Sequence, residues 1–297
     1  MSQDLLNLLF LVLLSITLGQ SWNVLGGFVG QVNLGHAAFF GIGALVTRQL
    51  WIGAGVPFPV AFVAGGVGAL VFAVVIGIPT FRLRGAYFSI GTLGLAEALR
   101  IAVGNQLPGI HTLPGPLTAD YVLSSRYELA LGLAAATTLA AWLVLRSRAG
   151  LGLLAVREDE VAARASGVGP LRHKLGALLL SSLGAGLAGA TYAFYQTSYY
   201  TQAVFDPSWT FDAIVITYVG GLGTVIGPII GAIFYIVLRE RLTLSFTQFH
   251  QVIFGVLFIL VVLLLPGGLV DGWGRLRAAG LRRAARAATG QPETSGV

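Results

Sequence analysis

The sequence contains no cysteine, which excludes disulfide bridges, zinc–thiolate sites and thiol nucleophiles. Its four histidines, His36, His111, His173 and His250, are not spaced as metal ligands, so no metal site is expected. A phosphate-binding loop of the form G-x-x-x-x-G-K-[ST] is missing, and no cluster of catalytic groups is evident. The sequence therefore predicts neither an enzyme nor a nucleotide hydrolase.

Charge is also scarce. Only 10% of the 297 residues are charged and 56% are hydrophobic, whereas a soluble domain has about 25% charged residues. Between residues 5 and 81 the single charge is Arg48. A bilayer core about 30 Å thick needs about 20 apolar residues per helix, so the chain is expected to cross a membrane repeatedly.

The net charge of +6 lies mainly in hydrophilic loops and in the C-terminal tail. This is the distribution that retains cationic loops in the cytoplasm, so we expect contact with membrane lipid and not with nucleic acid.

Glycine is abundant, with 41 residues, about twice the usual ~7%. In a membrane, small residues allow helix backbones to approach closely. Two stretches have the spacing of such contacts, Gly223-x-x-x-Gly227-x-x-x-Gly231 and Gly184-x-x-x-Ala188.

The predicted fold is an all-α, polytopic membrane helical bundle of about eight to ten membrane segments, some of them discontinuous. We predict helices over residues 5–25, 37–51, 58–78, 86–103, 127–145, 175–197, 206–219, 225–238 and 252–265. The first is interpreted as a retained helix, because no basic region precedes it as in a signal peptide. The helix at 206–219 opens with Asp206 as N-cap and Pro207. It is too short to span the bilayer comfortably.

Lys and Arg predict the orientation. Six lie in residues 146–174 and five in the tail, so both segments are expected in the cytoplasm and the loops 104–126 and 198–206 outside. Arg239 and Arg241 then fall outside as exceptions. The side of the N-terminus depends on whether the break at 26–36 re-enters or turns back. We assign residues 1–270 to the membrane domain, with the loop 146–174, and residues 271–297 to a basic tail.

Within that loop, residues 157–169 predict a short amphipathic helix. Val161, Ala165 and Val168 would share one face, and Glu160 and Arg164 would pair on a solvated face. Because Glu160 would be solvated, its loss is expected to cost little stability. Such a helix fits a groove on a partner protein or a position on the lipid surface.

The loop resembles the EAA loop of ABC-importer permeases, through the residues Glu160, Ala162, Ala163 and Gly167. With Glu158 and Asp159 before it, the stretch is similar to branched-chain amino acid permeases of the LivM type. Residues 30–44, 82–88 and 220–228 resemble further blocks of that family, in the family's order. The resemblance implies that the loop is a coupling helix that docks on an ATPase, with Glu158, Asp159, Glu160, Ala162, Ala163 and Gly167 as its coupling residues.

The resemblance implies a permease subunit of an ABC importer that moves leucine, isoleucine and valine across the bacterial plasma membrane. The chain would bind no cofactor, since ATP and magnesium belong to partner subunits. The implied partners are a second, LivH-like permease, two ATPase subunits and an extracellular amino-acid-binding protein. Urea or short-chain amides are alternative substrates. An ion-coupled secondary transporter is an alternative of another class, and it predicts paired intramembrane carboxylates.

Transport sites form where helices are broken, and residues 26–36 and 206–228 are the two predicted breaks. The candidate residues of the path are Gln31, Asn33, His36, Tyr87, Phe88, Glu97, Asp212, Gly220, Gly221 and Gly223. Alternatives stay open for several. Gln31, Asn33 and His36 would otherwise bond backbone groups freed by the break, Glu97 would pair with Arg100, and Asp212 would be wet near the external end of its helix.

Overall fold

The computed structural model describes residues 3–83, 85–107, 109–119, 121–245, 255–256 and 267–271. Within these ranges the chain is a bundle of helices, with one antiparallel pair of three-residue strands, β1 (Ile110–Thr112) and β2 (Ser198–Tyr200). The predicted all-α membrane bundle is confirmed. Of the predicted helix at 252–265 only residues 255–256 are described, and the tail beyond residue 271 lies outside the described residues.

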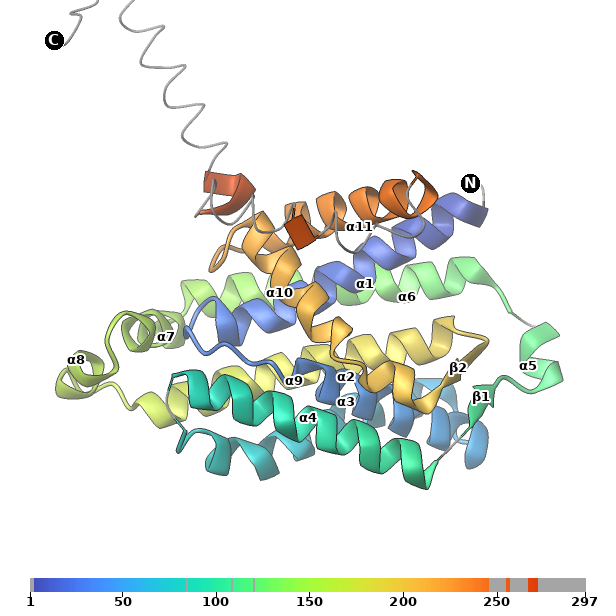
Figure 1. Cartoon of the computed structure of the whole chain (residues 1–297), viewed down its shortest axis with the longest axis horizontal. Helices are drawn as coiled ribbons and strands as arrows, with labels where there is room; N and C mark the ends of the chain where they lie inside the picture. The colour runs from blue at the N-terminus through green and yellow to red at the C-terminus, as the bar shows by residue number, and fades with distance from the viewer. Residues whose placement is uncertain are drawn as a thin grey trace, which may run out of the picture.

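Among the described residues, five helices are long and apolar enough to cross a membrane: α1 (Gln3–Gly26), α3 (Phe58–Thr80), α4 (Ala86–Gln106), α6 (Leu123–Arg146) and α9 (Pro170–Tyr195). They run along the same direction through the molecule (Figure 1). Helix α9 starts five residues earlier than the predicted 175–197, because Pro170 occupies its first turn, where a missing N–H carries no penalty.

Three further helices are α2 (His36–Arg48), α10 (Ser208–Gly220) and α11 (Gly227–Ser245). Helix α2 continues into a π-helical turn, η1 (Gln49–Gly53), and a 3-10 turn, η2 (Thr201–Phe205), leads from β2 towards α10. Helices α2 and α10 have 13 residues each, which gives lengths of about 20 Å, short of a hydrocarbon core about 30 Å thick. The predicted discontinuous helices are thus confirmed at α2 and at α10.

The molecule has two distinct ends (Figure 1). Helices α7 (Arg148–Glu158) and α8 (Glu160–Ala165) form one, which we call the α8 end, and the β1–β2 pair with α5 (Gly115–Ala119) forms the other. Residues 104–126 and 198–206 were predicted to share one side, and the pairing of β1 with β2 places them together. Helix α1 starts near the β1–β2 end, and the break after it turns the chain back into α2.

The loop between α6 and α9 differs from the prediction. The single amphipathic helix expected over 157–169 is divided at Asp159 into α7 and α8. The carboxylate of Asp159 accepts hydrogen bonds from the backbone of Val161 (2.7 Å) and Ala162 (3.1 Å). An aspartate that caps a new helix in this way stops the preceding one.

Small residues allow the central helices to touch. A Cβ atom on Gly189 of α9 would overlap the Phe40 carbonyl oxygen of α2, and one on Gly43 of α2 would overlap the Gly186 carbonyl oxygen of α9. Gly231 of α11 meets the Ile216 carbonyl of α10 in the same way. The predicted close packing through glycine is confirmed, and α9 lies against α1, α2, α3 and α6 at the centre of the bundle.

We expect Gly189→Ala to lower the stability of the folded chain. The added methyl group meets backbone, which cannot move aside as a side chain can, and overpacking of this kind costs about 1–3 kcal/mol. Gly176→Ala is the matched control, because a Cβ on Gly176 of the same helix meets nothing within 4 Å. Thermal unfolding of both variants in detergent tests this. Equal midpoints for the two would contradict the packing described.

Candidate functional site

The two predicted breaks lie against each other. The first comprises residues 27–35, between α1 and α2, and the second comprises residues 221–226, between α10 and α11. A Cβ on Gly27 would lie 2.8 Å from the backbone nitrogen of Gly223. We call these two segments the paired breaks. They bring together stretches that are about 200 residues apart in sequence.

Two amide side chains of α1 hold the second break. The Asn23 side chain donates to the Thr224 carbonyl oxygen at 2.8 Å and accepts from the Gly223 N–H at 2.9 Å. Gln20 donates to the Val225 carbonyl oxygen at 2.6 Å. Both side chains are fully buried. They replace the hydrogen bonds that a continuous helix would make, since an amide offers both a donor and an acceptor.

Asn23 also serves the first break, because its backbone carbonyl oxygen accepts from Gly27 (2.7 Å) and Phe28 (2.9 Å). Sequence analysis missed Gln20 and Asn23. The available signal was two amides, three residues apart, in the C-terminal half of a largely apolar helix.

The rest of the first break is bonded by its own residues and by α4. The Asn33 side chain accepts from the Gly35 N–H at 2.8 Å. From α4, Ser89 donates to the Val32 carbonyl oxygen at 2.7 Å, and Thr92 accepts from the Leu34 N–H at 3.2 Å. For Asn33 the geometry matches the alternative role of bonding backbone groups freed by the break.

His36 and Gln31 occupy different settings. His36 is the first residue of α2 and is buried, with Nε2 3.0 Å from the Ser21 hydroxyl of α1. The Gln31 side chain is half-buried, and its backbone N–H donates to the Leu25 carbonyl oxygen at 3.1 Å. His36 therefore ties the start of α2 to α1, while Gln31 lies at the edge of the break.

The starts of the two short helices meet. The Ala37 N–H in the first turn of α2 donates to the Thr210 hydroxyl in the first turn of α10 at 2.8 Å. Asp206 caps α10, as predicted, by accepting from the Ser208 N–H at 2.9 Å. The N-terminal end of each helix carries partial positive charge. The first turns of α2 and α10, each with a positive helix end, therefore lie in contact.

The glycines of the second break have conformational and packing roles. Gly221 and Gly223 have φ angles of +140° and +78°, which side-chain-bearing residues rarely adopt. Gly220 allows α10 to touch α11, because a Cβ there would overlap the Gly227 carbonyl oxygen.

Arg157 of α7 connects the loop at the α8 end to both breaks. Its Nη1 donates to the Gly27 carbonyl oxygen at 2.7 Å. The same nitrogen lies 2.5 Å from where a Cβ on Gly223 would sit. Sequence analysis counted Arg157 only as a positive charge of the loop. The structure gives it a contact with each of the paired breaks.

The coupling residues predicted from the loop lie at the α8 end. Glu158, Asp159, Ala162 and Gly167 are exposed, and Ala163 is buried. Val161 is 78% exposed and stands on the outer face of α8. Gly167 has φ of +84°, so the tight turn expected at the end of the helix is present.

Glu160 corrects one expectation. Its predicted pair with Arg164 is present at 3.5 Å, but its other carboxylate oxygen accepts from Lys174 of α9 at 2.6 Å. The Lys174 side chain is only 9% exposed. The expectation that loss of Glu160 would cost little stability rested on a solvated carboxylate; the bond to Lys174 means that removal of Glu160 leaves a nearly buried charge unpaired. The i,i+4 spacing predicted the pair of Glu160 with Arg164, but it could not predict the contact of Glu160 with Lys174 on α9.

The remaining candidates do not form one site. Glu97 is bound by Arg100 through two hydrogen bonds of 2.8 and 2.5 Å, which matches the local pair considered from the sequence. Phe88 is buried and stacks on Phe81 with ring centroids 5.3 Å apart, whereas Tyr87 is 74% exposed.

Asp212 was a candidate for the path, with a wet position near the external end of its helix as the alternative; its side chain is 23% exposed. It accepts a hydrogen bond from Tyr235 and pairs with Arg239 at 3.3 Å, so it ties α10 to α11.

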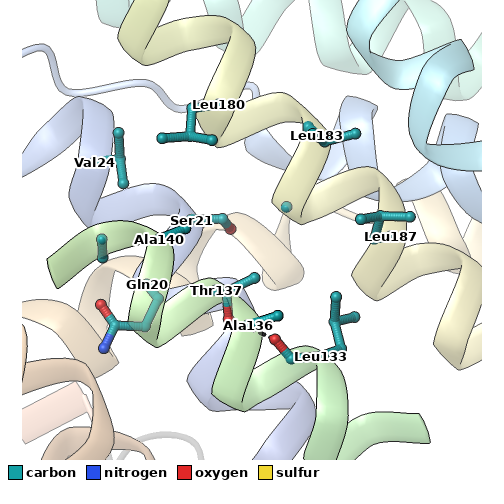
Figure 2. A pocket seen from close by; sticks show the side chains of 12 residues that line it. Gln20, Ser21, Val24, Leu133, Ala136, Thr137, Ala140, Leu180, Leu183 and Leu187 are labelled. Atoms are coloured by element: carbon teal, nitrogen blue, oxygen red, sulfur yellow. Dashed lines mark hydrogen bonds between the residues drawn. The ribbon is translucent and has the colours of Figure 1, made fainter. Parts of the chain in front are cut away.

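A cavity of about 190 Å³ lies between α1, α6 and α9. Figure 2 shows leucines of α9 facing Leu133, Ala136 and Thr137 of α6 across it. Gln20 and Ser21 of α1 also line it. None of the predicted path residues does. The cavity is mostly apolar. Two of its lining residues make the contacts described above: Gln20 bonds the second break, and Ser21 bonds His36.

Comparison with known proteins is consistent with this architecture. The family described as "Branched-chain amino acid transport system / permease component" matches residues 5–262. The chain is 30% identical to the "High-affinity branched-chain amino acid transport system permease protein LivM" of Escherichia coli (strain K12), over 91% of this chain and 70% of that protein. The protein of the same description from Salmonella typhimurium is 28% identical, over 88% and 68%.

A more distant relative, the "Probable branched-chain amino acid transport permease protein LivM" of Methanocaldococcus jannaschii, is 24% identical over 77% of this chain and 72% of that protein. No solved structure matches the chain. Because the family match covers most of the sequence and the Escherichia coli relative agrees with it, the chain belongs to the permease components of branched-chain amino acid transport systems.

Proposed function

We propose that this chain is one of two permease subunits of an ABC importer that carries leucine, isoleucine and valine across the bacterial plasma membrane. ATP and magnesium bind to two ATPase subunits, and an extracellular binding protein delivers the substrate. The observation that carries the proposal is the contact of Arg157, in an EAA-like loop, with both of the paired breaks. Urea and short-chain amides remain the alternative substrates.

The ion-coupled alternative is less well supported. Such a transporter is expected to hold paired carboxylates within the membrane. Among the described residues, Glu97 is paired with Arg100 and Asp212 with Arg239. Each carboxylate is thus already matched with a cation, Glu97 within α4 and Asp212 between α10 and α11.

Coupling is proposed to pass from α8 through α7 to the breaks. Val161 and Ala165 present an exposed apolar face that fits a groove on an ATPase. A displacement of α7 moves Arg157 and hence its contacts with Gly27 and Gly223. The breaks are the part of the membrane domain most able to respond, because glycines and single side-chain hydrogen bonds hold them instead of a continuous helical ladder.

The proposed orientation has the α8 end in the cytoplasm, and the cationic residues of the loop support it. Because the chain has no native cysteine, Ser166→Cys provides a single label on an exposed residue. We expect a membrane-impermeant maleimide to react only when it is given access to the cytoplasmic face. Reaction in intact cells would contradict this orientation.

Docking is tested at the exposed face of α8. We expect Val161→Asp to abolish co-purification of the ATPase subunits with the permease, because a desolvated charge would face an apolar groove. Membrane abundance and thermal midpoint should stay near those of the wild type, since the side chain is exposed. Undiminished recovery of the ATPase would assign α8 to the lipid surface instead.

The Arg157 contact is tested by uptake and ATPase activity in the assembled importer. We expect Arg157→Ala to reduce ATP-driven leucine uptake at least tenfold while the ATPase subunits remain bound, because the loop would dock but no longer hold the breaks. Arg157→Lys keeps one donor and should restore uptake in part.

Arg148→Ala is the matched control, as it removes the same charge from an exposed position on the same helix. Equal uptake in the Arg157→Ala and Arg148→Ala proteins would show that the charge of α7, and not its contact with the breaks, matters.

A further inference from the structure

A groove runs between α6 and α9. Helix α1 packs against both helices and forms the floor of the groove, whereas α6 and α9 contact each other less closely. The cavity of about 190 Å³ described above is one part of this groove (Figure 2). A second cavity of about 330 Å³ lies nearer the α8 end, where Ala149 and Leu153 of α7 line it. Val24 and Leu180 line both cavities, so the two parts adjoin.

The walls of the groove are apolar along both helices. The lining residues of each wall recur every three or four positions and so lie on one side of its helix. They are Leu133, Ala136, Thr137, Ala140 and Val144 of α6, and Gly176, Leu180, Leu183 and Leu187 of α9. The Thr137 hydroxyl is bonded within α6, since it donates to the Leu133 carbonyl oxygen at 2.9 Å. The groove therefore offers an apolar surface to whatever enters it.

The length of the groove matches one leaflet of a membrane. On α9 it extends from residue 172 to residue 187, which is about 22 Å at the helical rise. Half of a hydrocarbon core about 30 Å thick is about 15 Å. The groove is thus long enough to extend from one membrane surface to the middle of the bilayer.

The mouth of the groove, at the α8 end, is cationic. Arg172 and His173, near the start of α9, line the part next to α7. Arg148 directly precedes the lining residue Ala149, and Arg146 follows the α6 wall as the last residue of that helix. Among the described residues, no acidic side chain lines either part of the groove. A group bound at the mouth would therefore be surrounded by positive charge.

These cations have no anionic partner within the described part of the chain. Arg146, Arg148 and Arg172 are exposed and make no ion pair there. By contrast, Glu160 already pairs with two other cations of the same loop. The positive charge at the mouth is thus available to an anion from outside the protein.

Trp142 indicates the depth of the mouth. It lies one turn before the end of α6 and is 39% exposed, and the Arg146 guanidinium stands over its ring, 4.4 Å from the centroid. Exposed tryptophan beside arginine is typical of the level of the lipid headgroups. The mouth of the groove is therefore at the height of a phosphate, and its apolar part is at the height of the acyl chains.

We propose that the groove binds one acyl chain of an anionic phospholipid, with the phosphate against Arg172. Basic pockets between membrane helices bind such headgroups. The two cavities are too narrow to admit a helix about 10 Å wide, but an acyl chain fits them. The proposal goes beyond the proposed function and needs only that α6 and α9 cross the membrane. Because Leu153 of α7 lines the groove, the lipid would contact the helix that carries Arg157.

Lipid binding to the full chain, purified in mild detergent and stripped of lipid, tests the proposal. Phosphatidylglycerol and phosphatidylcholine with the same acyl chains are the probes, and native mass spectrometry counts the lipids bound. We expect at least tenfold more phosphatidylglycerol to be retained, with a higher thermal midpoint. Inorganic phosphate should not raise the midpoint, because it has no chain to fill the groove. Equal retention of the two lipids, or equal stabilisation by phosphate, would overturn the proposal.

Variants separate the mouth from the groove. We expect Arg172→Glu to abolish the preference for phosphatidylglycerol. Arg82→Glu is its matched control, because Arg82 is also exposed but does not line the groove. Gly176→Leu should reduce retention of phosphatidylglycerol at least tenfold, since its side chain would fill the groove. Gly132→Leu of α6 is the control. A Cβ on either glycine meets nothing within 4 Å, so both variants should fold.

Unchanged lipid retention in both Arg172→Glu and Gly176→Leu would contradict the proposal. Photo-crosslinking in the membrane identifies the occupant directly. A diazirine amino acid at Ala136, which is exposed in the α6 wall, should crosslink to phospholipid. Crosslinks from Ala136 to another protein subunit instead of lipid would assign the groove to a protein contact and overturn the proposal.

Discussion

Inside a bilayer no water is available to hydrogen-bond a peptide group, so each N–H and C=O released by a broken helix must be bonded within the protein. The structure of this chain depends on that requirement at two places. Asn23 contributes three atoms to meeting it. Its side-chain nitrogen and oxygen hold the second break, and its backbone carbonyl oxygen holds the first. Without a donor and acceptor at this position, the paired breaks would leave buried peptide groups unsatisfied.

The scaffold around the breaks is built on a different principle. Helix α9 touches α2, and α10 touches α11, at glycines where no side chain would fit. Close backbone contact of this kind deforms little. The breaks, in contrast, contain glycines with positive φ and are held by individual side-chain hydrogen bonds. The closely packed helices therefore form a rigid scaffold around the paired breaks. The breaks themselves are held by fewer and more easily exchanged hydrogen bonds. Arg157 is the side chain that reaches these segments from the loop at the α8 end.

Much of the fold followed from composition and spacing. Scarce charge predicted the membrane bundle, Pro207 and the Gly-Gly pairs predicted the short helices, and the six cationic residues of 146–174 marked one end. The failures have a common cause. Glu160 binds Lys174 fourteen residues away, Arg157 binds Gly27 across 130 residues, and Gln20 binds Val225 across 205. Local periodicity carries no information about such partners. The missed helix boundary at Asp159 has a local cause. Its side chain caps α8 and so ends α7, although the sequence around it has a continuous helical pattern.

The central claim is that movement of the loop at the α8 end reaches the paired breaks through Arg157. Hydrogen exchange measured by mass spectrometry on the assembled importer tests it most directly, with and without a non-hydrolysable ATP analogue. The account predicts that nucleotide binding changes the exchange of peptides covering residues 27–35 and 221–226 together, and that Arg157→Ala abolishes this change while nucleotide still binds. Exchange at both breaks that is insensitive to nucleotide in the wild-type importer would contradict it.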